Sequence, residues 1–471
     1  MKKFAWTYLA VFVIFIGLMW VIAMKGRDLV AAYGSLPGNI VPGKGAAHGA
    51  TNLGLLLMQV LVILLAARLM GYLAKKVRLP VVVGEMIAGI LLGPSLLGWL
   101  APNVSAFVFP PASLPTLSFI SQIGLILFMF VIGMELDTSR MRHKARAAVV
   151  ISHASILFPY FLGMTLAYFL FEKFAYTGTP FLSFALFMGI AMSITAFPVL
   201  ARILQERKLT QTPVGALAIT CAAADDVTAW CILAMVIAIV KAGDLTGALL
   251  TIVYSLAFVL LLLYPVKKWI AGRMEQLLGK KDGATRIIAL SFLVMISSAW
   301  LSETIGIHAL FGAFLAGVIM PRDARFQELL AGKVEDLSVL LLLPIFFAFT
   351  GLRTQIGLLG EGHYWWICGL IILVAVAGKF GGSMIAARLV GQDWRSSFEI
   401  GALMNTRGLM ELIVLNIGFD LGILSPEIFA MLVIMAISTT LMTGPALDLI
   451  NRYWEPRSAA TPVHLPTNGG S

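Results

Sequence analysis

The stretch PVGALAITCAAADDVTAWCILAMVIAIV, residues 213–240, is almost wholly apolar except for two adjacent acids, Asp225 and Asp226. A helix of this length spans the ~30 Å hydrocarbon core of a bilayer and places both carboxylates near its centre. One carboxylate at that depth costs about 2.5–3.5 kcal/mol, and such residues usually mark a transport pathway. The stretch therefore predicts a membrane-spanning helix with a functional acidic site. The alternative is a carboxylate pair that only holds helices together.

The rest of the chain has the same apolar character. Of its 471 residues, 59% are hydrophobic and only 12% are charged, and the mean hydropathy is +0.93. Soluble domains average about 45–50% apolar and about 25% charged residues, so lipid is the expected solvent. Fourteen apolar runs are long enough to be candidate spanning helices. They are roughly 4–24, 52–72, 80–101, 114–134, 146–172, 180–205, 213–240, 245–271, 286–302, 305–320, 338–353, 363–391, 396–420 and 425–450.

Positive charge gathers at alternate ends of these runs, as at Lys75/Lys76 and Arg140/Arg142. The formal net charge of +10 therefore reflects the positive-inside rule of a multispanning protein, and nucleic-acid binding is not expected. Applied from residue 52 onward, the rule places the start of the thirteen-helix core outside and its C-terminus in the cytoplasm. We expect a multi-pass protein of the cell inner (plasma) membrane.

Three regions follow from this organisation. Residues 1–51 form an N-terminal hydrophobic segment and a periplasmic linker, in which the first run is a retained helix or signal anchor, or a cleaved signal peptide. Residues 52–450 form the transmembrane domain, and 451–471 form a short cytoplasmic tail. The three cysteines lie within apolar runs, and we interpret them as packing residues. No spacing typical of a metal site is present, and no cofactor is expected.

An internal duplication is the clearest organisational signal. GEMIAGILLGP at 84–94 is echoed by FGAFLAGVIMP at 311–321, and FMFVIGMELD at 128–137 by IFFAFTGLRT at 345–354. Further on, the AMSITA motif that begins at Ala191 matches ALMNTR, which begins at Ala402. Six helices thus repeat as six more, and the single joining helix at 245–271 inverts the second copy. We therefore predict an all-α polytopic fold with two inverted six-helix repeats, an architecture of transporters with the binding site near the midplane.

The two aspartates are neighbours on one helix, so they point about 100° apart and face different partners. Lys379, near the middle of the run 363–391, is the candidate partner for one of them, because an unpaired ammonium there would be similarly costly. Snorkelling of Lys379 to an interface is the alternative.

Two motifs that break helices fall at matching points of the two repeats. Ser193, Thr195 and Pro198 interrupt the first copy, and Asn405 and Thr406 interrupt the second. Broken helices expose carbonyls and helix ends that can replace the hydration shell of a small cation, although a simple proline kink would also explain the first motif.

Three further charged residues have open roles. Arg407 and Glu411 are four residues apart, so they form an intrahelical ion pair, or Arg407 neutralises the helix-dipole ends where the broken helices cross. Glu85 lines an access funnel or pairs at a helix end. His308 is interpreted as a packing residue or polar contact between helices.

Together these motifs resemble the monovalent cation:proton antiporter-2 family. The matching elements are the 84–94 motif, the end of the helix at 133–137, TAFPVLARIL at 195–204, Asp225-Asp226, Lys379 and NTRGLMEL at 405–412. The resemblance covers about residues 52–450.

The resemblance implies a dimerisation domain and a core domain, with two crossed broken helices beside the ion-binding aspartate, and a homodimer. It also implies that Asp226 binds the cation or the proton while Asp225 pairs with Lys379. Members with two acids and the lysine are typically sodium/proton exchangers, and members with gated potassium efflux usually carry a cytoplasmic nucleotide-binding domain.

The predicted function is secondary active antiport of a monovalent cation, with Na+ favoured, for H+ by alternating access, with Thr195 assisting Asp226. Potassium/proton exchange or potassium efflux is the principal alternative. A channel is disfavoured by the repeat and the charged midplane, and an intramembrane aspartyl protease would need its two acids on different helices. The chain is not expected to be an enzyme.

Overall fold

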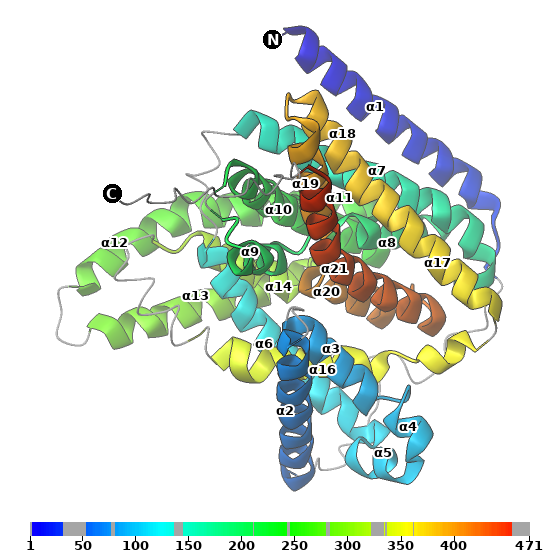
Figure 1. The fold of residues 1–471 in the computed structure, drawn as a ribbon. Coiled ribbons are helices and arrows are strands. Elements are labelled where there is room, and N and C mark those ends of the chain that lie inside the picture. Colours follow the sequence, from blue (N-terminus) through cyan, green and yellow to red (C-terminus); the bar gives the residue numbers. More distant parts are fainter. Residues whose placement is uncertain are drawn as a thin grey trace, which may run out of the picture.

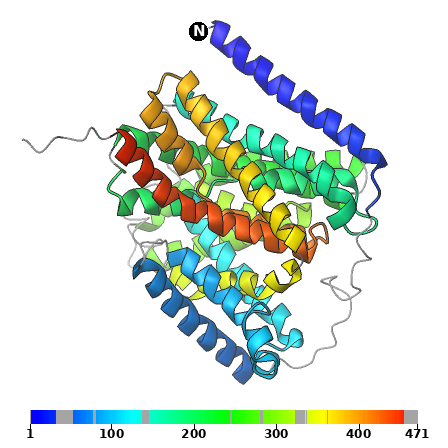
Figure 2. The ribbon, with the colours of Figure 1, turned by 45° about the vertical axis from the view of Figure 1, so that its right-hand side comes forward.

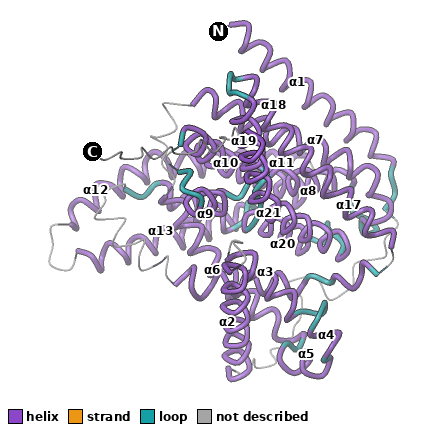
Figure 3. Tube along the Cα trace, in the orientation of Figure 1, coloured by secondary structure: helices purple, strands orange, loops and turns teal. Residues whose placement is uncertain are grey.

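We describe a computed structural model of the chain. It covers residues 2–31, 53–76, 81–135, 145–210, 212–242, 245–278, 283–321, 334, 337–360 and 362–454. The described residues form helices without a strand (Figure 3). The α-helices are α1 (Lys2–Lys25), α2 (Leu53–Lys76), α3 (Val81–Leu92), α4 (Leu97–Leu100), α5 (Pro102–Val108), α6 (Leu114–Glu135), α7 (Ala145–Phe174), α8 (Phe181–Ser193), α9 (Phe197–Glu206), α10 (Pro213–Ala242), α11 (Leu245–Leu261), α12 (Lys267–Leu278), α13 (Gly283–Ile305), α14 (Ala309–Val318), α16 (Leu343–Arg353), α17 (Gly362–Val376), α18 (Gly382–Leu389), α19 (Trp394–Met404), α20 (Leu409–Asp420) and α21 (Pro426–Trp454).

Ten helical segments among the described residues are long and apolar enough to cross a membrane, and the bent pair α19–α20 makes an eleventh. Two shorter apolar helices, α8 and α14, add to these. Each of the fourteen apolar runs of the sequence falls on one helix or on consecutive helices, and the runs 286–302 and 305–320 are separate helices, α13 and α14. The fold class of an all-α polytopic membrane protein is thus confirmed. Residues 32–51 of the predicted N-terminal region and 455–471 of the predicted tail lie outside the described residues.

The helices pack as two bundles. The scaffold bundle contains α2 to α6, α13, α14 and α16, and the core bundle contains α7 to α10 and α17 to α21. Helix α11 connects them, with extensive contacts to α10 of the core bundle and α13 of the scaffold bundle. In Figure 1 the helices α2, α3 and α6 lie below, and α7, α17 and α18 lie above; Figure 2 shows the same separation after rotation.

Helix α1 packs along α7 on the core side of the molecule, through edge-to-face contacts of Phe15 with Phe158 and Phe161 (Figure 1). It continues as a helix from Lys2 to Lys25, so the first apolar run forms a packed helix in this structure. Whether the segment is retained or cleaved stays a prediction.

Glycines at two crossings bring backbones of the scaffold bundle into direct contact. At the crossing of α3 and α16, Gly89 lies against Ala348 and Gly351. At the crossing of α6 and α14, Gly133 lies against Gly317. In both crossings a helix from one copy of the duplicated motifs meets a helix from the other copy. This reciprocal pattern is the one that an inverted repeat would produce, and the repeat itself stays a prediction.

Candidate functional site

The site lies in the core bundle, where α10 passes two interrupted helices. Helix α8 ends at Ser193 and α9 begins at Phe197, with Ile194 and Ala196 in extended conformations between them. Pro198 stands in the first turn of α9, where its missing N–H is tolerated. In the second pair, α19 ends at Met404 and α20 begins at Leu409, with a bend of 42°.

The two interruptions contact each other directly. The amide of Ala196 donates to the carbonyl of Thr406 at 3.1 Å, and Thr195 Oγ1 lies 3.4 Å from the carbonyl oxygen of Met404. The Thr406 hydroxyl is 3.2 Å from that of Thr443 on α21. The predicted crossing of the broken segments is therefore present, and each segment satisfies part of the backbone that the other leaves open.

Two cations bind the carbonyl end of α8. Arg407 donates from Nη1 to the carbonyl of Ala191 at 2.7 Å and from Nη2 to that of Met192 at 2.6 Å. Lys379 donates to the next carbonyl, that of Ser193, at 2.5 Å. Because the last carbonyls of a helix have no intrahelical partner and carry partial negative charge, both side chains stabilise this buried helix end.

Arg407 also lies 3.3 Å from Glu411, four residues later on α20, and both side chains are fully buried. The two roles that the sequence left open for Arg407 therefore coexist. Neither Glu411 oxygen accepts a hydrogen bond, and Asn405 Oδ1, at the end of α19, also lacks a partner among the described residues.

Asp225 is held by three donors. Its Oδ2 accepts hydrogen bonds from Ser155 Oγ at 2.5 Å and Thr195 Oγ1 at 2.7 Å, and from Lys379 Nζ at 3.0 Å. Neither Asp225 nor Lys379 is exposed at all. A buried ion pair is tolerated only when further hydrogen bonds support it. The two hydroxyl groups provide this support at Oδ2, whereas Oδ1 has no hydrogen-bond partner among the described residues.

Lys379 lies in a π-helical turn, Ala377–Gly381, between α17 and α18. Besides Asp225 and Ser193, its ammonium lies 2.9 and 3.0 Å from the carbonyl and hydroxyl oxygens of Ser155, so its three N–H groups are shared among four acceptors. The ammonium thus joins α7, α8 and α10 to the α17–α18 segment at a single point.

Asp226 differs from its neighbour in having no such partners. Its side chain is 2% exposed, and neither carboxylate oxygen accepts a hydrogen bond from the described side chains. The backbone amide of Phe197, at the start of α9, is its polar neighbour at the helix break. The N-terminal end of a helix favours negative charge or an ion pair beside it.

The structure thus assembles most of the predicted residues around the crossing. The Thr195 hydroxyl donates to Oδ2 of Asp225, because the extended segment before α9 directs it there. Ser193 contributes its carbonyl to Lys379. Glu85 lies apart from the crossing, in the scaffold helix α3, where it is 8% exposed.

Ser155 is a site residue that the sequence analysis did not identify. A serine within an apolar helix usually bonds to its own backbone, so its sequence signal is weak. Among the described residues, no cluster of three metal-ligating side chains is present.

Comparison with known proteins places this site in a family. Residues 61–450 match the model of the sodium/hydrogen exchanger transmembrane family. The chain is 43% identical over 392 residues to the Na(+)/H(+) antiporter NhaS4 of Synechocystis sp., covering 83% of this chain and 96% of that protein. It is 33% identical over 424 residues to the K(+)/H(+) antiporter 1 of Saccharomyces cerevisiae, covering 88% of this chain and 48% of that one, so it spans about half the yeast protein.

Among solved structures, the sodium proton antiporter MjNhaP1 of Methanocaldococcus jannaschii has the same fold, with a TM-score of 0.57 at 14% identity. The match covers 85% of this chain and 97% of that one. The matched family model spans most of the chain and includes both interrupted helices, both aspartates and Lys379. This chain is therefore a multi-pass membrane protein of the sodium/hydrogen exchanger family, a family of transporters.

Proposed function

We propose that the protein exchanges Na+ for H+ across the cell inner membrane by alternating access, with Asp226 as the group that binds either ion. The observation that carries this proposal is the contrast between the adjacent acids. Asp225 accepts three hydrogen bonds on one oxygen, whereas neither oxygen of Asp226 has a hydrogen-bond partner among the described residues.

An ionised carboxylate in a low-dielectric interior is unfavourable unless a cation or a proton neutralises it. Within the described part of the chain Asp226 has no fixed partner, so a small cation or a proton would take that place, and one excludes the other. When an ion neutralises Asp226, the core bundle can carry the site from one face of the membrane to the other. When Asp226 is ionised and empty, the bundle does not move, and the fluxes of Na+ and H+ are therefore coupled.

Asp225 and Lys379 have a fixed role in this proposal. Their ion pair stays inside the core bundle and holds the α8 end and the α7 serine in place. The geometry of the crossing is thereby kept while the ion on Asp226 changes. Thr195, which donates to Asp225, positions the pair and does not itself bind the cation.

In the proposed orientation the basic ends, such as Lys75 and Lys76 of α2, lie in the cytoplasm. Residues 52–450 act as the exchanger domain in a lipid bilayer, and the scaffold bundle joins two copies as a homodimer. Na+ is the favoured cation because the relative with 43% identity over 96% of its length is named a Na(+)/H(+) antiporter. K+ is the second candidate, since the yeast relative is named a K(+)/H(+) antiporter.

Everted membrane vesicles test the exchange. After acidification of the lumen, addition of Na+ should release the quenched fluorescence of a proton-sensitive dye, and Li+ and K+ measured separately give the selectivity. Asp226→Asn should abolish the response because the amide cannot exchange a proton for a cation. Asp448→Asn, which removes a surface ion pair with Arg207 within the core bundle, is the control that should retain it. A full response in Asp226→Asn, or none with any cation in the unaltered chain, would overturn the proposal.

A further inference from the structure

Two ion pairs join the bundles at one face of the molecule. Arg353, at the end of α16, lies 2.6 Å from Asp420, at the end of α20. Lys241, near the end of α10, lies 3.8 Å from Glu303, near the end of α13. In each pair one partner belongs to the scaffold bundle and the other to the core bundle. The charge pattern puts the basic end of α2 in the cytoplasm, and the predicted order of spans then puts all four helix ends at the outer face.

Arg353 makes the larger set of contacts across the bundles. Besides Asp420, its guanidinium donates to Asn416 Oδ1 at 3.3 Å and lies 5.4 Å from the ring of Phe419, both on α20. Within its own helix it lies 4.4 Å from the ring of Phe349. Asn416 in turn donates to Thr350 Oγ1 on α16 at 2.9 Å. One scaffold helix end and one core helix end are thus joined by charge, hydrogen bonds and one ring contact.

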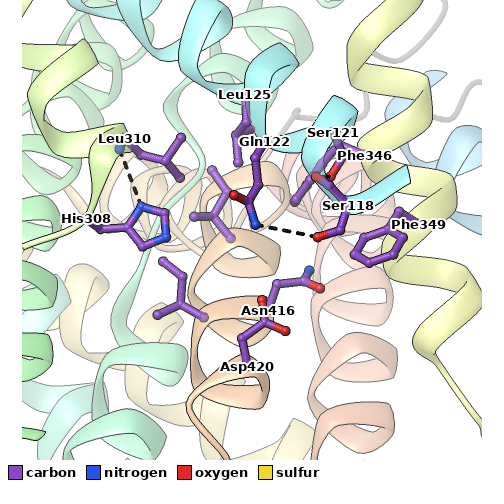
Figure 4. Close-up of a pocket in the computed structure, with 12 residues that line it drawn as sticks. Ser118, Ser121, Gln122, Leu125, His308, Leu310, Phe346, Phe349, Asn416 and Asp420 are labelled. Atoms are coloured by element: carbon purple, nitrogen blue, oxygen red, sulfur yellow. Dashed lines mark hydrogen bonds between the residues drawn. The ribbon is translucent and has the colours of Figure 1, made fainter. Parts of the chain in front are cut away.

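A small polar cavity lies directly beside this junction (Figure 4). Its volume is about 30 Å³, enough for a water molecule or two. Its polar lining includes Ser121 and Gln122 from α6, His308 before α14, and Asn416 and Asp420 from α20. In Figure 4, Gln122 lies above Asn416, with His308 and Phe349 on opposite sides. The cavity therefore separates scaffold from core with polar groups on both walls.

We propose that the Arg353–Asp420 pair, supported by Lys241–Glu303, is a latch that holds the outer end of the two bundles closed and must release for the site to open to the outside. The proposal rests on the exchange by alternating access proposed above. Its physical basis is the position of the charges. The Arg353 and Asp420 side chains are 22% and 30% exposed, so both can be hydrated on release and the pair can open reversibly.

The Lys379–Asp225 pair is unsuited to this role. It is wholly buried and both partners belong to the core bundle, so bundle separation does not break it. The Arg207–Asp448 pair is partly exposed, but both partners belong to the core bundle. It therefore serves as the matched control, because its loss removes an ion pair that does not connect the two bundles.

Accessibility of the cavity from outside tests the latch. Ser121 lines the cavity and is 2% exposed, so Ser121→Cys is a reporter of opening. The three native cysteines, Cys221, Cys231 and Cys368, are replaced by alanine, and intact cells are treated with a membrane-impermeant maleimide. Arg353→Gln and the nearly isosteric Asp420→Asn should each speed labelling about fivefold, the upper range for a partly exposed pair. Glu303→Gln should speed it less, because the 3.8 Å pair is weaker.

Asp448→Asn should leave the labelling rate unchanged. The latch is overturned if Arg353→Gln and Asp420→Asn both label at the rate of the reporter alone, or if Asp448→Asn speeds labelling equally. Labelling requires no ion flux, and exchange is measured in parallel on the same reporter chain. Absent exchange with accelerated labelling would refute the proposed function but not the bundle opening, whereas normal exchange with unchanged labelling would refute the latch alone.

Discussion

Echoed sequence motifs form two kinds of helix crossing in this molecule, and they are held together in opposite ways. In the scaffold bundle, glycines bring backbones into direct contact, as at Gly89 with Gly351 and Gly133 with Gly317. In the core bundle the crossing of the interrupted helices is held by charges and hydrogen bonds from Arg407, Lys379 and Thr406. The first arrangement joins backbones through small residues, whereas the second keeps polar groups at membrane depth.

The difference follows from what each crossing must provide. Close packing of small residues stabilises helices in a membrane without polar groups, and is suited to a fixed platform. Buried charges are costly and persist where they serve a function, as beside an ion site. Substitutions at the two crossings should therefore destabilise the protein for different reasons. In the core bundle they remove charge compensation, and in the scaffold bundle the new side chain overlaps a backbone.

The largest loss of stability should come from removal of the core cation. Lys379→Met leaves the Asp225 carboxylate buried without a countercharge, which should lower the free energy of unfolding by about 3–5 kcal/mol. Adding Asp225→Asn removes that charge and should restore most of the loss. Thermal unfolding of the purified protein in detergent measures both. The charge compensation would be contradicted if Lys379→Met were as stable as the unaltered chain, or if the double variant were less stable than Lys379→Met.

In the scaffold, a single methyl group should be enough to disrupt packing. A Cβ at Gly351 would overlap the backbone of Gly89, so Gly351→Ala should cost about 3 kcal/mol despite the better helix propensity of alanine. Gly369→Ala on α17 has open space around the new methyl group and should cost nothing. The yield of monodisperse protein and its melting temperature check the pair. If Gly351→Ala and Gly369→Ala were equally stable, the scaffold crossing would not depend on backbone contact at Gly351.

A smaller effect should distinguish two serines of α7. Ser155→Ala removes a hydrogen bond to Asp225 and one to Lys379, with an expected cost of about 1.5–3 kcal/mol for bonds to charged groups. Ser152 is also buried, but its hydroxyl has no hydrogen-bond partner in the described part of the chain, so Ser152→Ala should be close to neutral. The same unfolding measurement applies. If Ser152→Ala were the more damaging, the assignment of Ser155 to the charge network would be wrong.

Much of this arrangement could be predicted from the sequence. The length of the apolar runs predicted the helices. The interruptions were predicted from Pro198 and from the polar residues that begin at Asn405. The cost of an isolated ammonium in the membrane predicted that Lys379 pairs with an aspartate. These predictions succeed because solvation by lipid leaves few alternatives for a backbone or a charge.

Other features depend on geometry that the sequence does not encode locally. Thr195 was expected to assist Asp226 but contacts Asp225, because its direction depends on the extended backbone after Ser193. Arg353 and Asp420 both end apolar runs and resemble ordinary solvated helix ends. Their contact depends on how the two bundles meet, and no local pattern indicates it.

The central claim is that Asp226 exchanges a proton for a cation while Asp225 remains paired. Its most direct test is the number of protons released when Na+ is added to purified protein in a weakly buffered solution with a pH indicator. We expect release from the unaltered chain and from Asp448→Asn, and none from Asp226→Asn. Undiminished release from Asp226→Asn would contradict the account.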